Sequence, residues 1–370
     1  MKTPRYPIVK PYLPALEKYQ TRVDEIFSRN YLTNNGPLLQ LLEKRLAVFL
    51  GVEHVLLVAN GTLALNVAYA ALNIQGKVLT TPFSFAATAS SLCWQGIAPS
   101  FVDIDPATLN IDINAVSVES AESASAILPV HVFGNPCQVD KISAFAKQYD
   151  LKVIYDAAHA FASELDGQSL LNYGDAATLS LHATKLFHCV EGGAIIFKDK
   201  AIYEKAKQLI NFGFDKKHYP QYVGINAKMS EFHAAMGLAV LDDIEHITSQ
   251  RKLLVECYHQ NLARLPQVTF QQWHKQGNRN GAYMPIIFET EAQVLMVMER
   301  LAVDGIQTRR YFYPSLSQVT VYGGNEDTPV GNDISARILC LPLYTDLNAT
   351  GVNYICDKVR LALEPRNLHR

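Results

Sequence analysis

The chain has 370 residues, and 33 Lys and Arg against 35 Asp and Glu give it a formal net charge of −2. Hydrophobic residues make up 49% and charged residues 18%, as in an ordinary globular protein, and the length favours two domains over one. This charge balance provides no basic face for nucleic acid and no polybasic membrane signal, and no apolar run is long enough to cross a bilayer.

The N-terminal stretch and the cysteines bear on the cellular compartment of the protein. Residues 1–7 lack the apolar segment of a signal peptide. The six cysteines lie scattered at positions 93, 137, 189, 257, 340 and 356, without CxxC spacing. Such cysteines are typical of reduced, packed thiols. We therefore expect a cytoplasmic protein.

Short apolar runs alternate with helical patterns over the first 200 residues. Helical spacing of apolar side chains predicts helices over 37–50, 62–72 and 139–149. Strand-sized apolar runs occupy 54–59, 78–81, 99–103, 126–131, 152–156, 174–180 and 194–197. This alternation predicts an α/β fold with a mainly parallel sheet flanked by helices.

The pattern changes near residue 228. Apolar residues at helical spacing from Met229 to Ile244 predict one long helix that continues past Gln250. After it, strand-like runs at 283–288 and 338–341 alternate with helical runs at 292–303 and 352–363. We therefore predict a large domain over residues 1–245 and a smaller α+β domain over residues 246–370.

Lys185 lies between two apolar runs, in Ser180-Leu-His-Ala-Thr-Lys185, with Glu191-Gly-Gly193 soon after it. Burying an unpaired ammonium group is costly, so this lysine needs a partner or a chemical role. A desolvated amine loses its proton more easily and can form a Schiff base with an aldehyde. The segment predicts a reactive amine and a pocket for an aldehyde cofactor.

Three other segments each allow two interpretations. Asn60-Gly61-Thr62 joins a predicted strand to a helix, where backbone N–H groups can bind a phosphate, although an ordinary helix cap explains the tripeptide alone. Asp156 ends an apolar strand, where ligands gather in parallel sheets; a helix cap is the alternative. Phe85 can stack on a planar ligand or fill the core.

Metal and hydrolase chemistry are disfavoured. Common zinc spacings do not fit the positions of His159, His182, His188 and Cys189, so no metal is expected. A Gly-x-Ser-x-Gly motif is absent. In contrast, a phosphate cradle, an aromatic ring, a strand-end aspartate and a buried lysine are together the parts needed to hold pyridoxal phosphate.

Several ordered motifs resemble the DegT/DnrJ/StrS family of nucleotide-sugar aminotransferases, which have the aspartate aminotransferase fold (fold type I). The resemblance covers nearly the whole chain. It is carried by residues 60–65, 82–88, 101–105, 129–134, 156–159, 180–185, 191–193, 224–231 and 310–314. The fold that it implies agrees with the α/β alternation.

The resemblance implies pyridoxal 5'-phosphate as cofactor, with pyridoxamine phosphate formed during the reaction. Lys185 is then the Schiff-base lysine, and Asp156 pairs with the pyridine nitrogen. The other implied cofactor contacts are Gly61, Thr62 and Ser180 at the phosphate, Phe85 on the ring, His159 near the 3-oxygen and Asn226 from the neighbouring subunit. His159 departs from the glutamine of many relatives. A homodimer with shared active sites follows from the Asn226 motif.

The resemblance also implies a reaction. Family dehydratases carry histidine at the position of Lys185, so the lysine favours transfer of an amino group from L-glutamate to a nucleotide-linked ketosugar. Residues 182–188 and 191–194 resemble members that aminate C4 of dTDP-4-keto-6-deoxyglucose to give dTDP-4-amino-4,6-dideoxyglucose for O-antigen or other glycans. Amination at C3 and UDP- or GDP-linked sugars remain open. The candidate sugar contacts are Tyr31, Asn35, His182, Tyr311 and Tyr313.

A function of another class also remains open. The chain can be a non-catalytic sugar-nucleotide-binding or regulatory protein that has kept the fold. The intact Lys185 and Asp156 argue against this alternative, because a binding module needs neither a reactive amine nor a strand-end carboxylate.

Overall fold

The computed structural model describes residues 4–323 and 327–364. Within them, the main sheet has seven strands in the order β1-β9-β8-β5-β4-β2-β3. The strands are β1 (Leu56–Val58), β2 (Lys77–Thr80), β3 (Ala98–Phe101), β4 (Ala124–Leu128), β5 (Lys152–Asp156), β8 (Ala176–Ser180) and β9 (Gly193–Phe197). Only β9 runs against its neighbours in this sheet, which confirms the predicted mainly parallel sheet.

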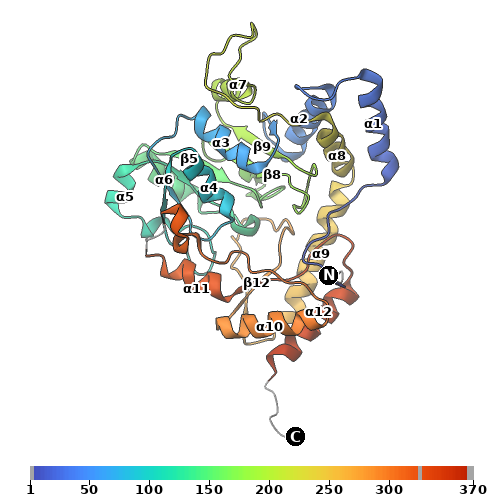
Figure 1. Cartoon of the computed structure of the whole chain (residues 1–370). Helices are drawn as coiled ribbons and strands as arrows, with labels where there is room; N and C mark the ends of the chain where they lie inside the picture. Colours follow the sequence, from blue (N-terminus) through green and yellow to red (C-terminus); the bar gives the residue numbers. More distant parts are fainter. Residues whose placement is uncertain (1–3, 324–326, 365–370) are drawn as a thin grey trace.

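Helices cover both faces of the sheet because successive strand residues point to opposite sides (Figure 1). One face packs against α3 (Gly61–Ala71), α4 (Ala86–Trp94) and α7 (Lys200–Leu209). The other packs against α2 (Pro37–Leu50), α6 (Val139–Gln148) and α8 (Glu231–Leu241). The helices α1 (Leu16–Arg29) and α5 (Val118–Ser123) and the short strands β6 (Glu164–Leu165) and β7 (Gln168–Ser169) complete this part.

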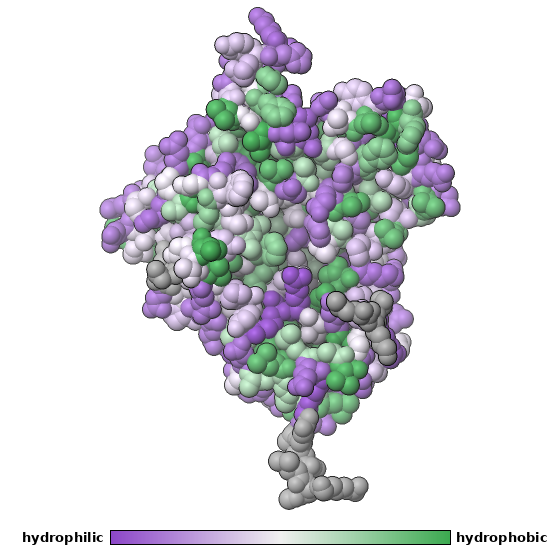
Figure 2. All heavy atoms as spheres, in the orientation of Figure 1, coloured by the Kyte–Doolittle hydropathy of each residue, from purple (hydrophilic) through white to green (hydrophobic). Residues whose placement is uncertain are grey.

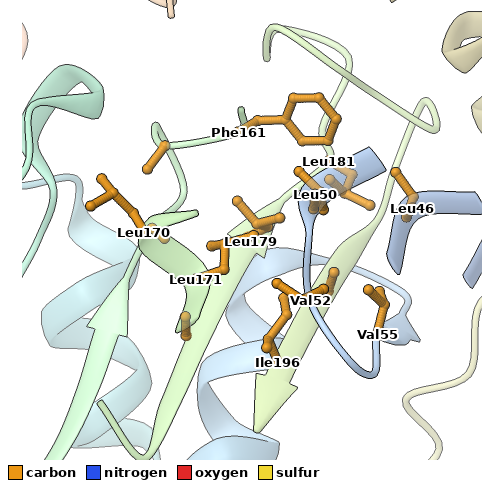
Figure 3. Packing of buried hydrophobic residues seen from close by; sticks show 14 of the residues in the cluster. Leu46, Leu50, Val52, Val55, Phe161, Leu170, Leu171, Leu179, Leu181 and Ile196 are labelled. Carbon is orange, nitrogen blue, oxygen red and sulfur yellow. The ribbon is translucent and has the colours of Figure 1, made fainter. Parts of the chain in front are cut away.

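One buried hydrophobic cluster fills the face of the main sheet that α2, α6 and α8 cover. Leu46 and Leu50 of α2 lie close to Leu179 of β8 and Ile196 of β9 (Figure 3). Leu181, the first residue after β8, is fully buried in the same cluster. This packing holds the start of the segment that carries Lys185.

The C-terminal part has a hydrophobic cluster of its own. Its strands β10 (Val268–Thr269), β11 (Pro285–Phe288) and β12 (Ile338–Cys340) form an antiparallel sheet. Its helices are α9 (Ile244–Leu262), α10 (Glu291–Val303), α11 (Pro329–Arg337) and α12 (Ala349–Leu363). The predicted domain limits, 1–245 and 246–370, stay a prediction, since α9 runs across this boundary.

The predicted single helix from Met229 past Gln250 is wrong. The structure has two helices, because α8 ends at Leu241 and α9 begins at Ile244. Asp242 accepts a hydrogen bond from Arg45 Nη1 (2.6 Å), and Asp243 accepts one from the Tyr12 hydroxyl (3.0 Å). Aspartate also favours helix ends over helix interiors. These contacts with distant residues hold the break, and the apolar spacing on either side gives no sign of it.

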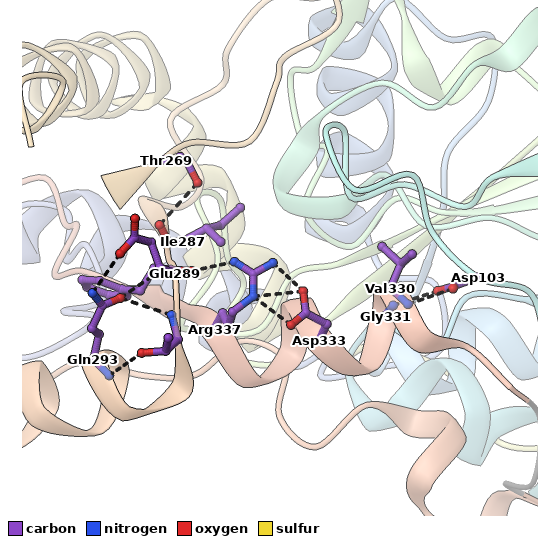
Figure 4. A network of polar contacts seen from close by, with 11 residues as sticks. Asp103, Thr269, Ile287, Glu289, Gln293, Val330, Gly331, Asp333 and Arg337 are labelled. Carbon is purple, nitrogen blue, oxygen red and sulfur yellow. Dashed lines mark hydrogen bonds and ion pairs between the residues drawn. The ribbon is translucent and has the colours of Figure 1, made fainter. Parts of the chain in front are cut away.

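Polar contacts hold both ends of α11 (Figure 4). At its start, Asp103 accepts hydrogen bonds from the backbone N–H groups of Val330 (2.9 Å) and Gly331 (2.7 Å). At its end, Arg337 donates to the carbonyl of Phe288 in β11 (2.6 Å). Asp103 follows β3, so α11 links the main sheet to the C-terminal sheet.

The described surface shows no large apolar patch on the face drawn in Figure 2, and the described cysteines form no disulfide bonds. On the face drawn in Figure 2, hydrophobic side chains lie in small groups among hydrophilic ones. Among the described residues, no helix combines the length and apolar character needed to span a membrane. All six cysteines are free, and Cys137, Cys189, Cys340 and Cys356 are buried.

Candidate active site

A cavity of about 290 Å³ lies at the carboxyl ends of β5 and β8. It brings together residues that are far apart in the sequence but were all predicted to serve one site. These are Gly61, Thr62, Phe85, Asp156, His159, Ser180, His182, Lys185 and Tyr311. The parallel strands explain the convergence, since their carboxyl ends meet at one edge of the sheet.

The N-terminus of α3 forms one wall of the cavity. Asn60 caps the helix by accepting a hydrogen bond from the N–H of Leu63 (2.9 Å). A Cβ atom on Gly193 would lie 2.3 Å from the carbonyl oxygen of Asn60, so glycine is required there for the helix to begin against β9. The first N–H groups of the helix and the hydroxyls of Thr62 and Ser180 suit a phosphate group.

Asp156 is almost fully buried, and its carboxylate is held from two sides. Its Oδ2 accepts a hydrogen bond from Thr88 Oγ1 (2.8 Å), and its Oδ1 accepts one from the N–H of Ala158 (3.1 Å). Thr88 Oγ1 also lies 2.7 Å from Ser84 Oγ. Because Thr88 gives its only hydroxyl proton to Asp156, Ser84 donates to Thr88. This chain of hydroxyls fixes the plane of the carboxylate.

Burial raises the pKa of Asp156, while the hydrogen bonds from Thr88 and Ala158 and the charge of Lys185 lower it. A carboxylate in such surroundings gains from a cationic partner. A protonated ring nitrogen of a ligand supplies one. The side chain thus fits the role predicted for it at the end of β5.

Lys185 lies in the loop between β8 and β9, and its Nζ donates a hydrogen bond to the hydroxyl of Tyr283 (3.1 Å). Burial lowers the pKa of Lys185 to about 8, although Asp156 and Tyr311 act in the opposite direction. An amine with this pKa is partly neutral near pH 8 and can act as a nucleophile or base. The predicted reactive amine therefore has a suitable environment.

His159 is a neutral hydrogen-bond donor. Its Nδ1 accepts a hydrogen bond from the N–H of Phe133 (3.2 Å), which leaves the proton on Nε2. Burial and the nearby Lys185 charge hold the pKa of His159 well below its ordinary value. The ring lies parallel to Phe312, with 5.5 Å between the ring centroids. A neutral imidazole of this kind can donate to a ligand oxygen.

Four predicted residues lie outside this cavity, and their roles stay predictions. Asn226 is exposed, Tyr31 donates its hydroxyl to the carbonyl of Asn34 (2.9 Å), and Asn35 lines a second cavity of about 220 Å³. Tyr313 is half exposed and lies under the guanidinium group of Arg310. The role predicted for Asn226 requires a second subunit.

The cavity also includes residues that were not predicted: Ser84, Glu191, Tyr283, Arg309 and Phe312. Glu191 Oε1 lies 3.6 Å from His182 Nε2. Ser84 and Glu191 lie inside segments that carried the family resemblance, so those segments contained a signal for them. Tyr283 and Arg309 lie in other parts of the chain, without such a signal. No cluster of His, Cys, Asp and Glu suited to a metal ion occurs in the described ranges.

An amine of lowered pKa, a buried carboxylate and a helix N-terminus in one cavity define an enzyme site for a phosphorylated aldehyde cofactor. Residues 15–360 match the DegT/DnrJ/EryC1/StrS aminotransferase family, and the chain belongs to this family. This finding confirms the predicted resemblance. Family membership implies pyridoxal phosphate, and the donors around the cavity fit its phosphate, ring nitrogen and aldehyde.

The chain is similar to dTDP-4-amino-4,6-dideoxy-D-glucose transaminases. It is 40% identical to that of Shigella dysenteriae, over 95% of this chain and 98% of the relative. Identity to that of Escherichia coli is 38%, over 92% and 94%. The crystal structure of DesI in the presence of its TDP-sugar product matches with a TM-score of 0.92 and 33% identity, covering 98% of this chain and 93% of DesI. These matches confirm the predicted fold class.

Proposed function

We propose that this protein transfers the amino group of L-glutamate to C4 of dTDP-4-keto-6-deoxy-D-glucose, which gives dTDP-4-amino-4,6-dideoxy-D-glucose. The names of the two transaminases and the TDP-sugar product of DesI support the choice of substrate. The observation that carries the proposal is the single cavity shared by Lys185, Asp156 and the N-terminus of α3. We further propose a cytoplasmic location and a role in surface polysaccharide synthesis, such as that of O-antigen.

Pyridoxal phosphate, when bound, supplies an electron-withdrawing ring that stabilises negative charge on the carbon bearing the amino group. We propose that Gly61, Thr62 and Ser180 bind its phosphate. Asp156 binds the protonated ring nitrogen, and Phe85, which is 52% exposed at the cavity, provides a face for the ring. His159 donates to the oxygen on the ring.

Lys185 moves the proton in both halves of the reaction. Its amine takes a proton from the carbon that bears the amino group and returns one during transfer to the sugar. The hydrogen bond to Tyr283 holds Nζ in place between these steps. Tyr311 and Phe312 line the same cavity and limit the access of water. His182 and Tyr311 are our candidates for contacts with the sugar.

We also propose a homodimer in which each subunit contributes to the other's site. The segment between α7 and α8 exposes several large apolar side chains to solvent: Phe212, Tyr219, Tyr222, Val223 and Ile225. It projects from the rest of the molecule in Figure 1. Burial against a second copy explains such a surface. We propose that Asn226, Tyr31 and Asn35 act at the partner's cavity, as their predicted roles require.

Turnover with defined substrates tests this function. The enzyme is incubated with L-glutamate and, in separate reactions, with 4-keto and 3-keto sugars linked to dTDP, UDP or GDP, and NMR locates the new C–N bond. We expect amination at C4 of the dTDP sugar. Absence of turnover with that sugar would contradict the proposed substrate. A protein that stays colourless with added pyridoxal phosphate and forms no borohydride-stable adduct at Lys185 is instead a binding module.

Removing the Thr88 hydroxyl is expected to weaken cofactor binding. Thr88→Val keeps the shape of the side chain but leaves Asp156 Oδ2 without its donor, which costs about 1–3 kcal/mol, or roughly 5- to 150-fold in affinity. Spectrophotometric titration with pyridoxal phosphate measures the effect, and Thr88→Ser should restore most of the affinity. Equal affinity of Thr88→Val and the native protein would show that this hydroxyl does not hold the carboxylate.

A further inference from the structure

Arg309 lines the cavity with a positively charged side chain, and the proposed reaction gives this side chain no role. The charged side chains that line the cavity are Asp156, Glu191, Lys185 and Arg309. Lys185 is used for proton transfer, and the cofactor phosphate is assigned to the N-terminus of α3. Over residues 4–323 and 327–364, the guanidinium group of Arg309 forms no ion pair. Its positive charge is therefore available to a ligand.

The neighbouring Arg310, in contrast, has a structural role, since its guanidinium group is bound by other residues of the protein. Arg310 is mostly buried and donates to the Glu291 carboxylate (2.7 Å) and to the carbonyl of Ala336 (2.9 Å). Within the part of the chain that the structure describes, Arg309 has no such partners. Its side chain is exposed and lies over the ring of Tyr311, 4.8 Å from the centroid. These two adjacent arginines are thus used differently, and only Arg309 lines the cavity.

The backbone keeps Arg309 at this place. Its N–H donates to the carbonyl of Cys340 (3.2 Å), and the N–H of Cys340 donates back to the carbonyl of Arg309 (2.8 Å). Cys340 belongs to β12 and is buried. A guanidinium group that is anchored at its backbone and rests on an aromatic ring loses little freedom when it binds an anion.

We infer that Arg309 binds a carboxylate group of the amino donor. This inference rests on the proposed function, in which L-glutamate must bring its amino group to the reacting end of the cavity. A carboxylate of the donor then lies near Asp156 and Glu191, and without a cation this like charge is costly. A guanidinium group offers two parallel N–H donors that match a carboxylate. The cavity offers no other cation besides Lys185 among its lining residues.

Calorimetric titration of the enzyme loaded with pyridoxal phosphate tests the inference without turnover. Glutarate, a dicarboxylate without an amino group, is the first probe, and dTDP is the second. We expect Arg309→Gln to weaken glutarate binding about 10- to 100-fold, as for loss of a charged hydrogen-bond pair, and to leave dTDP binding unchanged. Arg309→Lys should retain part of the affinity, since it keeps the charge but not the paired donors.

Arg264→Gln is the matched control, because Arg264 is exposed and does not line the cavity. The inference is overturned if Arg309→Gln binds glutarate as the native enzyme does, or if it weakens only dTDP, which would assign Arg309 to the nucleotide diphosphate. It is also overturned if the native enzyme shows no saturable glutarate binding. Failure of the proposed sugar substrate is a separate result: it appears as missing turnover, whereas glutarate binding still depends on Arg309.

Discussion

Replacing Lys185 with alanine is expected to abolish amino transfer and leave the fold intact. The variant lacks the amine that takes and returns the proton, and no other amine of the described residues lines the cavity, so kcat should fall by about 10⁴-fold or more. Product formation measured by NMR gives the rate. Lys185→Arg is the matched variant: it keeps a positive charge but no neutral amine, and it should also be inactive. Full activity of either variant would contradict the role assigned to Lys185.

The same variant should change how the stability of the cofactor-free protein depends on pH. Burial lowers the pKa of Lys185 from 10.5 to about 8 in the folded state. Between these values the unfolded chain binds more protons than the folded chain, so the Lys185 contribution to the free energy of unfolding becomes more favourable as pH rises. Urea unfolding at about pH 7 and about pH 10 measures this contribution as a difference: the free energy of unfolding of the native protein should rise relative to that of Lys185→Ala between these two pH values, since the other titrating groups are common to both.

Asp156→Asn is expected to lower kcat by about 10²- to 10³-fold, the usual effect of losing one preorganised electrostatic group. Asparagine keeps the size of the side chain and can still accept the hydrogen bond from Thr88. It lacks the negative charge that favours a protonated ring nitrogen. The rate should therefore fall more than the affinity for pyridoxal phosphate, which NMR assays and spectrophotometric titration measure separately.

Two further variants test whether the loss of rate is specific to the charge and position of Asp156. Asp166→Asn, at an exposed carboxylate that does not line the cavity, should behave as the native enzyme does. Asp156→Glu keeps the charge but moves it, and should recover only part of the rate. If Asp156→Asn turned over the ketosugar at the native rate, the charge of Asp156 would have no part in catalysis.

Local signals in the sequence explain which elements could be predicted. The helix over 37–50 was predicted to its observed bounds, because Pro37 begins α2 and Gly51 ends it in a left-handed conformation. The break at Asp242 and Asp243 could not be predicted, since apolar spacing continues across it and the stabilising contacts come from Tyr12 and Arg45. The helix α1 was also missed, because Ile26 is its only fully buried residue.

The same distinction applies to the site. Asp156 could be predicted because a carboxylate at the end of a buried strand conflicts with its surroundings, and Lys185 because it lies between two apolar runs. Tyr283 could not be: it precedes an apolar strand and resembles a core residue, and its hydroxyl meets Lys185 from 98 positions away. Thr88 meets Asp156 from 68 positions away. Only the packing of the C-terminal part against the main sheet creates the first of these contacts.

The helix α9 has a consequence for the geometry of the site. Ile244 and Ile247 near its start are buried in the cluster beneath the main sheet, whereas Leu254 and Tyr258 are buried in the C-terminal cluster. One residue inserted between them would turn the second group by about 100° about the helix axis relative to the first. Tyr283 and Arg309 reach the cavity from beyond α9. The number of residues in α9 therefore sets the rotation of the C-terminal part, which carries Tyr283 and Arg309, relative to the main sheet, which carries Asp156 and Lys185.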